Sequence, residues 1–370
     1  MEQLNHWYQT LHRYPERSRK EYQTAERLTA WLAEMGLTVH RIGETAVVGV
    51  LTGDKAGKTV ALRADMDALP ITECTDLPYA SENQGVMHAC GHDFHMTAAL
   101  GAAKLLSKQK NELCGTVQFV FQPDEEEDGY AAFLANHPIM KDTAAVFGAH
   151  VDPTLPKGVF GFKSGVFYAS AAKFDIVFRG KSAHGATPQN GIDALAAAAD
   201  TVPKLLALRE TGETPAMISV GTFESGLARN IIADTATLTG ILRTADPIKR
   251  NQVFLKIKAI LAEAEEAFGV TVSLDFTHGY IGITNPEQTC HLAKNEAIRR
   301  FGRENVMDIP TPLMTTEDFG EYLTGRDGCF YHIGVGGEEG LHSSRFAPDP
   351  ALLPNAAALH AAIILKYLEK

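Results

Sequence analysis

The chain has 370 residues, 45% of them hydrophobic, and a formal net charge of -11. This length exceeds what one hydrophobic core usually supports, so we expect two domains. The acidic balance argues against a phosphate-binding surface and so against nucleic acid as the main partner. The sequence has no uncharged apolar run of 18 residues and no basic region followed by an apolar run at its start, so we predict a cytoplasmic protein without a membrane partner.

The cysteines support the same location. They are odd in number, widely spaced and form no CxxC pair: Cys74, Cys90, Cys114, Cys290 and Cys329. This pattern is typical of free thiols in a reducing compartment rather than of a disulfide framework.

The first half of the chain alternates between strand and helix signals. Apolar residues at helical spacing predict a helix over residues 20–36, where Gly36 is a good stop. The strand-like runs "AVVGVL" and "TVALRAD" come next, then a helix from about Asp93 and the strand "TVQFVFQ". A short helix near residues 130–136 and the strand "AAVFGAH" follow. Such alternation is typical of an α/β layer with a mainly parallel sheet.

The pattern changes at about Ala169. A strand, an alanine-rich helix, two strands, a long helix and a final strand follow in the order βαββαβ. This order is typical of a ferredoxin-like α+β domain, in which two helices pack on a small, mostly antiparallel sheet. Helix and strand signals then resume and continue to the end of the chain. We therefore predict an α/β domain of residues 1–168 and 281–370, interrupted by an inserted α+β domain of residues 169–280.

Residues 87–95 read "MHACGHDFH" and concentrate side chains that bind metals or carry protons. Cys90 and His92 are two residues apart, just before the predicted helix, and Gly91 lets the backbone turn so that both can converge on one cation. A buried thiol beside a hydrogen-bonded histidine at a helix start would give the same pattern, so the pair alone does not distinguish the two. We interpret His88 and His95 as ordinary solvated or hydrogen-bonded histidines, because only their proximity to the pair sets them apart.

Acid and base residues also follow successive strands of the predicted sheet. They are Asp65 and Asp67, then Glu125 and Glu126, then His150, with His342 after a later strand. The carboxyl ends of strands in an open α/β sheet meet at one edge, where ligand sites form. A lone carboxylate is usually a solvated charge, but clustered carboxylates repel one another, and a bound dication is the simplest compensation.

Taken together, these segments resemble the co-catalytic metallopeptidases that include aminoacylases and glutamate carboxypeptidases. The matching segments occur in order from about residue 10 to the end of the chain: "RADMDALPI", "MHACGHDFHMTAALG", "FQPDEEE", "GAHVDP", "GKSAHGATPQNGIDA", "RNIIAD", "GILRT", "TTEDFG" and "GLHSSRF". The similarity is greatest to the amidohydrolase branch of hippurate hydrolases, auxin-conjugate hydrolases and N-acetyldiaminopimelate deacetylases. The resemblance implies a zinc-peptidase-like catalytic domain with an inserted lid and dimerisation domain.

The resemblance also implies a pair of divalent ions. Their ligands would be Cys90, His92, Glu126, His150 and His342. Glu125 would be the general acid/base, and Asp67 would orient a ligand imidazole. A thiolate with imidazoles suits zinc, whereas a carboxylate also admits manganese, cobalt or nickel. The resemblance to the family favours manganese or zinc among these ions.

Three residues of the inserted domain match family residues that contact the substrate. His184 would stabilise the oxyanion, reaching across from the other subunit of a homodimer. Asn230 and Arg243 would hold the carboxylate of a small-molecule substrate, a task that suits a guanidinium because it forms two parallel hydrogen bonds.

The acidic run after "FQP" departs from the family pattern. The family usually has a small residue at the position of Asp124 and glycine at that of Glu127, which leaves the register of the run open. Counting from Pro123 selects Glu125 as the base and Glu126 as the ligand. The surplus acids could raise the proton affinity of their neighbours.

The predicted function is metal-dependent hydrolysis of the amide bond of N-acetyl or N-aroyl amino acids. A dipeptidase or aminopeptidase acting at the same site, or a non-catalytic metal-binding homologue, are the alternatives. A mononuclear zinc oxidoreductase would need a dinucleotide fingerprint, and the candidate "GVGGEEG" fails because Glu339 occupies the third glycine position. No motif names the acyl group or the amino-acid side chain.

Overall fold

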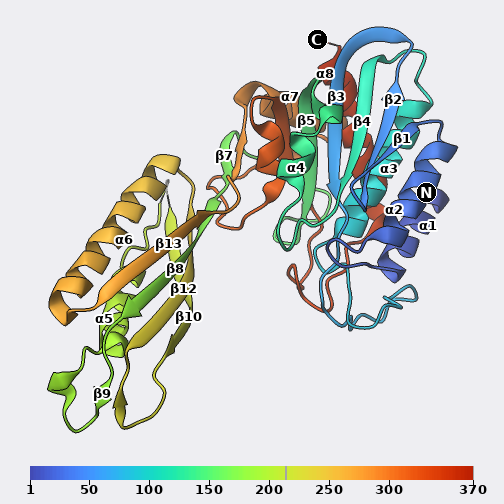
Figure 1. Cartoon of the computed structure of the whole chain (residues 1–370). Coiled ribbons are helices and arrows are strands. Elements are labelled where there is room, and N and C mark those ends of the chain that lie inside the picture. The colour runs from blue at the N-terminus through green and yellow to red at the C-terminus, as the bar shows by residue number, and fades with distance from the viewer. Residues whose placement is uncertain (213–214, 370) are drawn as a thin grey trace. The chain divides into compact units, whose positions relative to one another are not determined.

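The computed structural model describes residues 1–212 and 215–369. It divides into two compact units (Figure 1). The first unit comprises Met1–Gly165, Thr284–Pro310 and Asp318–Lys370, and the second comprises Val166–Ile283 and Thr311–Glu317. The second unit is thus an insertion in the sequence of the first.

A mixed sheet of eight strands forms the centre of the first unit (Figure 1). In spatial order the strands are β1 (Thr38–Ile42), β2 (Ala46–Thr52), β4 (Cys114–Gln122), β3 (Lys55–Asp65), β5 (Thr143–Asp152), β16 (Asp327–Gly334), β6 (Phe160–Phe162) and β15 (Val306–Asp308). The central strands β4, β3, β5 and β16 run parallel to one another, whereas β1 and β2 are antiparallel at one edge. The predicted α/β fold with a mainly parallel sheet is confirmed.

The first unit also contains α-helices, most of which contact this sheet. They are α1 (Glu2–Arg13), α2 (Tyr22–Glu34), α3 (His92–Ser107), α4 (Ala131–Ala135), α7 (Glu287–Phe301) and α8 (Leu353–Leu368). Helices α3 and α8 pack against each other and against β3, β4 and β5. Every residue of α3 from His92 to Ala103 is buried, as expected for a helix that is apolar on most sides. Helix α1 and strand β1 have no counterpart among the predicted elements.

Helix α8 is long and apolar enough, with the turn before it, to cross a membrane by length and composition alone. Most of this segment is buried inside the unit. Leu353, Leu359, Ile363 and Ile364 are completely inaccessible to solvent. Its apolar character is therefore that of a core helix.

Strand β3 occupies a topological switch point. It lies between β4 and β5, although the chain reaches β4 through α3 and then reaches β5 on the other side. Ligand sites in open α/β sheets form outside the carboxyl ends of the strands at such a point. The carboxyl ends of β3, β4 and β5 are therefore the expected location of a functional site.

The second unit is an α+β fold built in the predicted βαββαβ order. Its elements are β8 (Ser170–Arg179), α5 (Ala194–Leu206), β10 (Ala216–Ser225), β12 (Thr235–Thr244), α6 (Pro247–Phe268) and β13 (Thr271–His278). The four strands form an antiparallel sheet in the order β10-β12-β8-β13. Helices α5 and α6 contact each other and both contact the sheet, over an apolar core of their own. A separate pair, β9 (Ala183–His184) and β11 (Ile231–Ile232), is also antiparallel.

The borders of the two units differ slightly from the predicted ones. The second unit begins at Val166 rather than at residue 169 and ends at Ile283 rather than at residue 280. The strands β7 (Gly165–Tyr168) and β14 (Ile283–Asn285) pair where the chain enters and leaves the insertion.

Residues 311–317 also belong to the second unit, whereas the sequence places them in the catalytic domain. The reason is backbone pairing: the Leu313 N–H donates to the Phe167 carbonyl, and the Ala169 N–H donates to the Leu313 carbonyl, both at 2.8 Å. Such long-range pairing has no local sequence signal. The role of the second unit as a lid and dimerisation domain stays a prediction.

Candidate metal centre

Four of the predicted site residues lie at the carboxyl ends of three neighbouring strands. Asp67 lies two residues beyond β3, and Glu125 and Glu126 follow β4. His150 lies in β5, two residues before the strand ends. The parallel sheet therefore delivers these side chains to one edge, as predicted from the strand pattern.

Cys90 and His92 reach the same edge from the start of α3. Gly91 between them has a left-handed backbone (φ 82°), and a Cβ atom there would lie 2.6 Å from Cγ2 of Val151. Only glycine combines this conformation with so close an approach. The predicted turn at Gly91 thus places the thiol and the imidazole on the same side of the chain.

His342 comes from the loop after β16. Its backbone is also left-handed (φ 64°), which is uncommon for a residue other than glycine. Its N–H donates to the Ala89 carbonyl at 2.8 Å, which attaches this loop to the segment before α3. The His342 side chain is about half exposed, whereas Cys90, His92 and His150 are buried.

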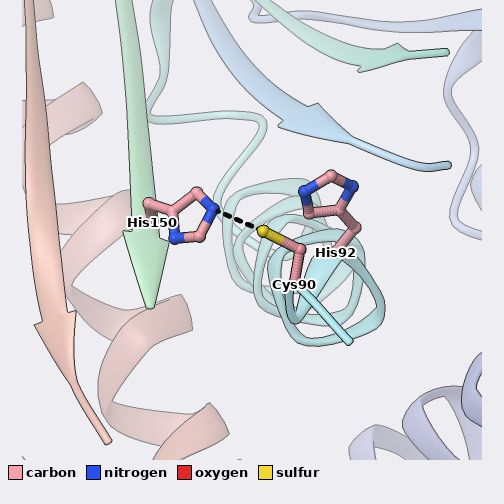
Figure 2. A group of neighbouring side chains, drawn as sticks. All are labelled: Cys90, His92 and His150. Carbon is pink, nitrogen blue, oxygen red and sulfur yellow. Dashed lines mark hydrogen bonds between the residues drawn. The ribbon is translucent and has the colours of Figure 1, made fainter. Parts of the chain in front are cut away.

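The candidate ligands form two overlapping groups. The ligand atoms of Cys90, His92 and His150 lie within 4.8 Å of one another, and so do those of Cys90, Glu126 and His342. Figure 2 shows the first group, in which Sγ of Cys90 is 3.4 Å from Nε2 of His150. The thiol belongs to both groups, so these five side chains form one continuous cluster.

Backbone hydrogen bonds set the tautomers of the two buried imidazoles. Nδ1 of His150 donates to the Val151 carbonyl at 2.7 Å, and Nδ1 of His92 donates to the Asp67 carbonyl at 2.9 Å. In both rings Nε2 is then the nitrogen that faces the cluster, and it offers a lone pair when the ring is neutral. Within the described part of the chain, the buried Nε2 of His92 has no hydrogen-bond partner.

The spacing of these atoms fits a divalent ion. Bonds of 2.0–2.3 Å at tetrahedral angles would separate two ligand atoms by about 3.3–3.8 Å. Oε1 of Glu126 lies 3.8 Å from Nε2 of His92 and 3.4 Å from Nε2 of His342. Thiol, imidazole and carboxylate are all ligand types that zinc and related ions accept. An ion would also satisfy the buried nitrogen of His92.

The charges around His92 favour a cation. Burial opposes a charge on this ring, but the carboxylates of Asp65, Asp67 and Glu126 raise the pKa of His92 to about 10. Burial and the neighbouring rings hold the pKa of His150 well below its ordinary value, so His150 is neutral. Burial and nearby carboxylates raise the pKa of the Cys90 thiol. A dication would compete with the proton on His92 and favour the Cys90 thiolate.

Asp65 and His95 form a buried pair next to these ligands. Nδ1 of His95 donates to Oδ1 of Asp65 at 2.6 Å, and its Nε2 accepts the Val151 N–H at 2.9 Å. The two rings of His95 and His150 have centroids 4.6 Å apart. Both nitrogens of His95 are thus occupied, which agrees with its interpretation as a hydrogen-bonded histidine. Its support of His150 was not predicted; the one signal is its position three residues after His92, on the same face of α3.

Arg63 extends this network beneath the strand ends. Its guanidinium donates to Asp65 at 2.7 Å, to Asp318 at 2.8 Å and to Gln122 at 3.0 Å, and all of these side chains are buried. A buried charge is tolerated only when it is paired and fully hydrogen-bonded. Arg63 and Asp318 are 255 positions apart, so no local pattern could have identified the pair.

The acidic run has a definite arrangement. Glu126 shares a ligand group with Cys90 and His342, and Glu125 shares one with His92 and Glu126. This is the placement that the count from Pro123 predicts, although the roles of the two residues stay a prediction.

The structure does not bring the three predicted residues of the second unit to one place. His184 and Asn230 are neighbours, because Ile231 pairs with His184 and the Gly185 N–H donates to the Asn230 carbonyl at 2.8 Å. Arg243 lies near the far end of β12, eight residues after Thr235. At the rise of a strand this separation is roughly 25 Å. Within the described part of the chain, the buried Nε of Arg243 has no hydrogen-bond partner.

Known proteins of similar sequence and structure have related activities. Thermostable carboxypeptidase 1 from Saccharolobus solfataricus is 35% identical over 374 residues, covering 97% of this chain and 94% of that protein. N-acetyl-L-cysteine deacetylase from Bacillus subtilis is 34% identical over 351 residues, covering 94% of this chain and 84% of that protein. The crystal structure of the Bacillus subtilis YXEP protein, described as a dinuclear metal-binding peptidase, has a TM-score of 0.89 at 31% identity. It covers 100% of this chain and 98% of that one.

These similarities and the donor cluster define the class of the protein, which is a metallo-amidohydrolase. The profile of Peptidase family M20/M25/M40 matches residues 61–366. The chain belongs to this family, and both the resemblance read from its sequence and the predicted enzyme class are confirmed.

Proposed function

We propose that the protein hydrolyses the amide bond of N-acyl amino acids with the help of two divalent ions. The observation that carries this proposal is the pair of ligand groups that share Cys90, with Glu125 beside them. The deacetylase relative, whose name states an N-acyl amino acid substrate, supports the same reaction. N-acetyl and N-aroyl amino acids are the expected substrates.

In this proposal the ions are held by Cys90, His92, Glu126, His150 and His342. Two bound ions would polarise the amide carbonyl and lower the pKa of the attacking water. The thiolate and imidazoles favour zinc, and the carboxylate ligand also admits manganese, cobalt or nickel. Manganese or zinc is our assignment.

Glu125 is the proposed general acid/base. Its side chain is largely buried and shares a group with His92 and Glu126, yet it is not needed as a ligand in either group around Cys90. It would accept the proton of the attacking water and pass it to the leaving amine. Asp67 would hold His92 in place, since its Oδ1 lies 3.3 Å from Nδ1 of that ring.

The inserted unit would supply the substrate contacts. Arg243 and Asn230 would hold the substrate carboxylate, and His184 would stabilise the oxyanion. Arg243 lies roughly 25 Å along β12 from Thr235, the end of the strand that follows the β9–β11 pair, and this is longer than a small N-acyl amino acid. We therefore expect that one copy of the unit does not present all three residues to one substrate. A homodimer in which one subunit provides Arg243 and the other provides His184 and Asn230 would remove this difficulty.

Cleavage of short peptides is the second candidate function. The carboxypeptidase relative favours it, and the carboxylate contacts proposed for Arg243 and Asn230 would serve a peptide C-terminus equally well. We also propose a cytoplasmic location, because free thiols such as those of the five cysteines are typical of a reducing compartment. Either function is compatible with this location.

A panel of N-acetyl amino acids, N-benzoyl amino acids and dipeptides, assayed with added manganese or zinc, tests the proposal. We expect release of the free amino acid from the acylated substrates. Glu125→Gln should retain both ions and lose nearly all turnover, because only the proton acceptor is removed. Substantial turnover by this variant would contradict the assignment of the base, and hydrolysis of dipeptides alone would favour the second candidate.

A further inference from the structure

The turn that carries Glu125 has an unusual backbone. Asp124, directly before Glu125, is left-handed with φ 56°. Besides His342, the described part of the chain contains one other left-handed residue that is not glycine, which is Arg19 with φ 61°. Residues other than glycine are uncommon in this conformation, and they keep it where contacts with the surrounding structure hold them.

Arg19 and Asp124 hold each other. Nε of Arg19 donates to Oδ2 of the buried Asp124 carboxylate at 2.6 Å, and Oδ1 of Asp124 accepts the Asp128 N–H at 3.3 Å. The backbone N–H groups of Asp124 and Arg19 both donate to Oε1 of Glu21, at 3.1 and 3.0 Å. The segment around Arg19 therefore forms a closed network with the residue before Glu125.

The residue after Glu125 is held from the same segment. The Glu126 N–H donates to Oδ2 of Asp67 at 3.0 Å, and the same oxygen accepts the Ser18 hydroxyl at 2.7 Å. Glu125 is thus bracketed by two fixed residues, and both are connected to residues 18–21.

Charge makes Arg19 the critical member of this network. The Asp124 carboxylate is fully buried one residue from Glu125, and its Oδ2 pairs with Nε of Arg19. Without Arg19 this carboxylate would lack its cationic partner, which is a costly arrangement for a buried charge. Arg17, in the same segment, pairs with Glu127 at 2.7 Å, but both of these side chains are nearly half exposed. Exposed pairs of this kind contribute little.

We propose that Arg19 is a positioning residue that acts through Asp124. It fixes the turn that presents Glu125 to the substrate and Glu126 to the metal ions. The part of this inference that concerns Glu125 rests on the proposed function, whereas the part that concerns Glu126 is a statement about ion binding.

The first test compares Arg19→Ala with Arg17→Ala, which removes the same charge from the same segment. Titration of the metal-free proteins with Mn²⁺ or Zn²⁺ should show binding about tenfold weaker in R19A, the size of effect seen when a partner of a metal ligand is lost. In R17A we expect a change below about twofold. The kcat of R19A should fall about tenfold or more with KM changed less than about threefold, because a displaced base affects the chemical step.

The second test examines the path through Asp124. In R19A/D124A no unpaired buried carboxylate remains, so its kcat and ion affinity should exceed those of R19A and approach those of Asp124→Ala. Arg19→Lys, which keeps a cation beside Asp124, should retain most of both. Arg19 is 57% exposed, so its variants should fold, and Arg19→Gln gives the same comparison with less loss of packing.

Two results would overturn the proposal. R19A and R19Q could behave like R17A in both measurements, or the losses of R19A and D124A could simply multiply in the double variant. If the wild-type protein hydrolyses none of the substrates, the proposed function fails, but the ion titrations still decide whether Arg19 positions Glu126.

Discussion

The first unit buries three of its five candidate ligands, whereas the second unit leaves two of its three predicted substrate contacts at the surface. Around Cys90, hydrogen bonds determine the tautomers of His92 and His150. In the second unit, His184 and Asn230 are exposed on a short strand pair, and Arg243 lies elsewhere. Hydrogen bonds within the first unit thus hold the donors of the candidate ion site in one cluster, whereas the predicted substrate contacts lie at separate places in the second unit.

The largest expected effect comes from the shared thiol. Cys90→Ala removes a donor from both ligand groups, so the ion content should fall below two per chain and activity should drop by more than about a thousandfold. Metal analysis after dialysis measures this directly. Cys74→Ala, which removes an exposed thiol, is the control and should change neither quantity. An unchanged ion content in C90A would remove the thiol from the ligand set.

The second largest effects are expected from substitutions in the second unit, which should change catalysis or substrate binding but not ion binding. His184→Ala should keep both ions but lower kcat by about 100- to 1000-fold, the loss expected for one oxyanion donor. Arg243→Ala should raise KM, because it removes a contact to the substrate carboxylate.

Co-expression of H184A with R243A sharpens this test. If the site is shared between subunits, half of the randomly formed dimers are mixed and contain one intact site of two, which restores about a quarter of wild-type activity. The presence of mixed dimers should be verified. If their activity is no higher than the mean of the activities of H184A and R243A, the site is not shared between subunits.

A smaller effect is expected from substitution of His95, which contacts the candidate ligand His150 and is not itself in the ligand set. His95→Asn loses the acceptor of the Val151 N–H, because the shorter side chain has no counterpart of Nε2, so His150 is less well supported. Ion binding should weaken by about tenfold without loss of either ion at saturation. Isothermal titration against the wild type measures this, with His137→Asn, at a histidine outside the candidate ligand groups, as a control. Equal affinities for H95N and the wild type would limit His95 to a packing role.

The smallest effect concerns pH and stability. His12 is buried between Asp93, at 2.6 Å, and Glu73, at 3.2 Å. Burial opposes its charge, but these carboxylates raise the pKa of His12 to about 9. A raised pKa stabilises the folded state fully below the ordinary value of about 6.5, and this stabilisation is lost as the pH rises through about 9.

The contribution of His12 is at most about 3 kcal/mol. Thermal denaturation between pH 6 and pH 10 should therefore show a steeper loss of stability in the wild type than in His12→Gln. Parallel pH profiles for the two proteins would show that His12 carries no charge in the folded state.

Part of the site could be predicted because several of its residues lie at or just after the ends of strands. Asp67, Glu125 and His150 come at or near the ends of apolar runs, and parallel strands place such positions at one edge. The residues that hold them in place through hydrogen bonds had no such signal in the sequence. Arg63 meets Asp318 across 255 positions and Arg19 meets Asp124 across 105, and spacing along the chain carries no information about such contacts.

The sequence by itself determined the α/β alternation, the inserted βαββαβ segment and the identity of the candidate donors. The first two depend on periodicity and on local order, which each segment carries within itself, whereas the donors are those that the resemblance to the family implies. Only the tertiary structure decided which ring nitrogen of His92 and His150 faces the cluster, how Asp124 is paired, and that Arg243 lies far from His184. Each of these depends on hydrogen bonds or distances between segments that are brought together only when the cores form.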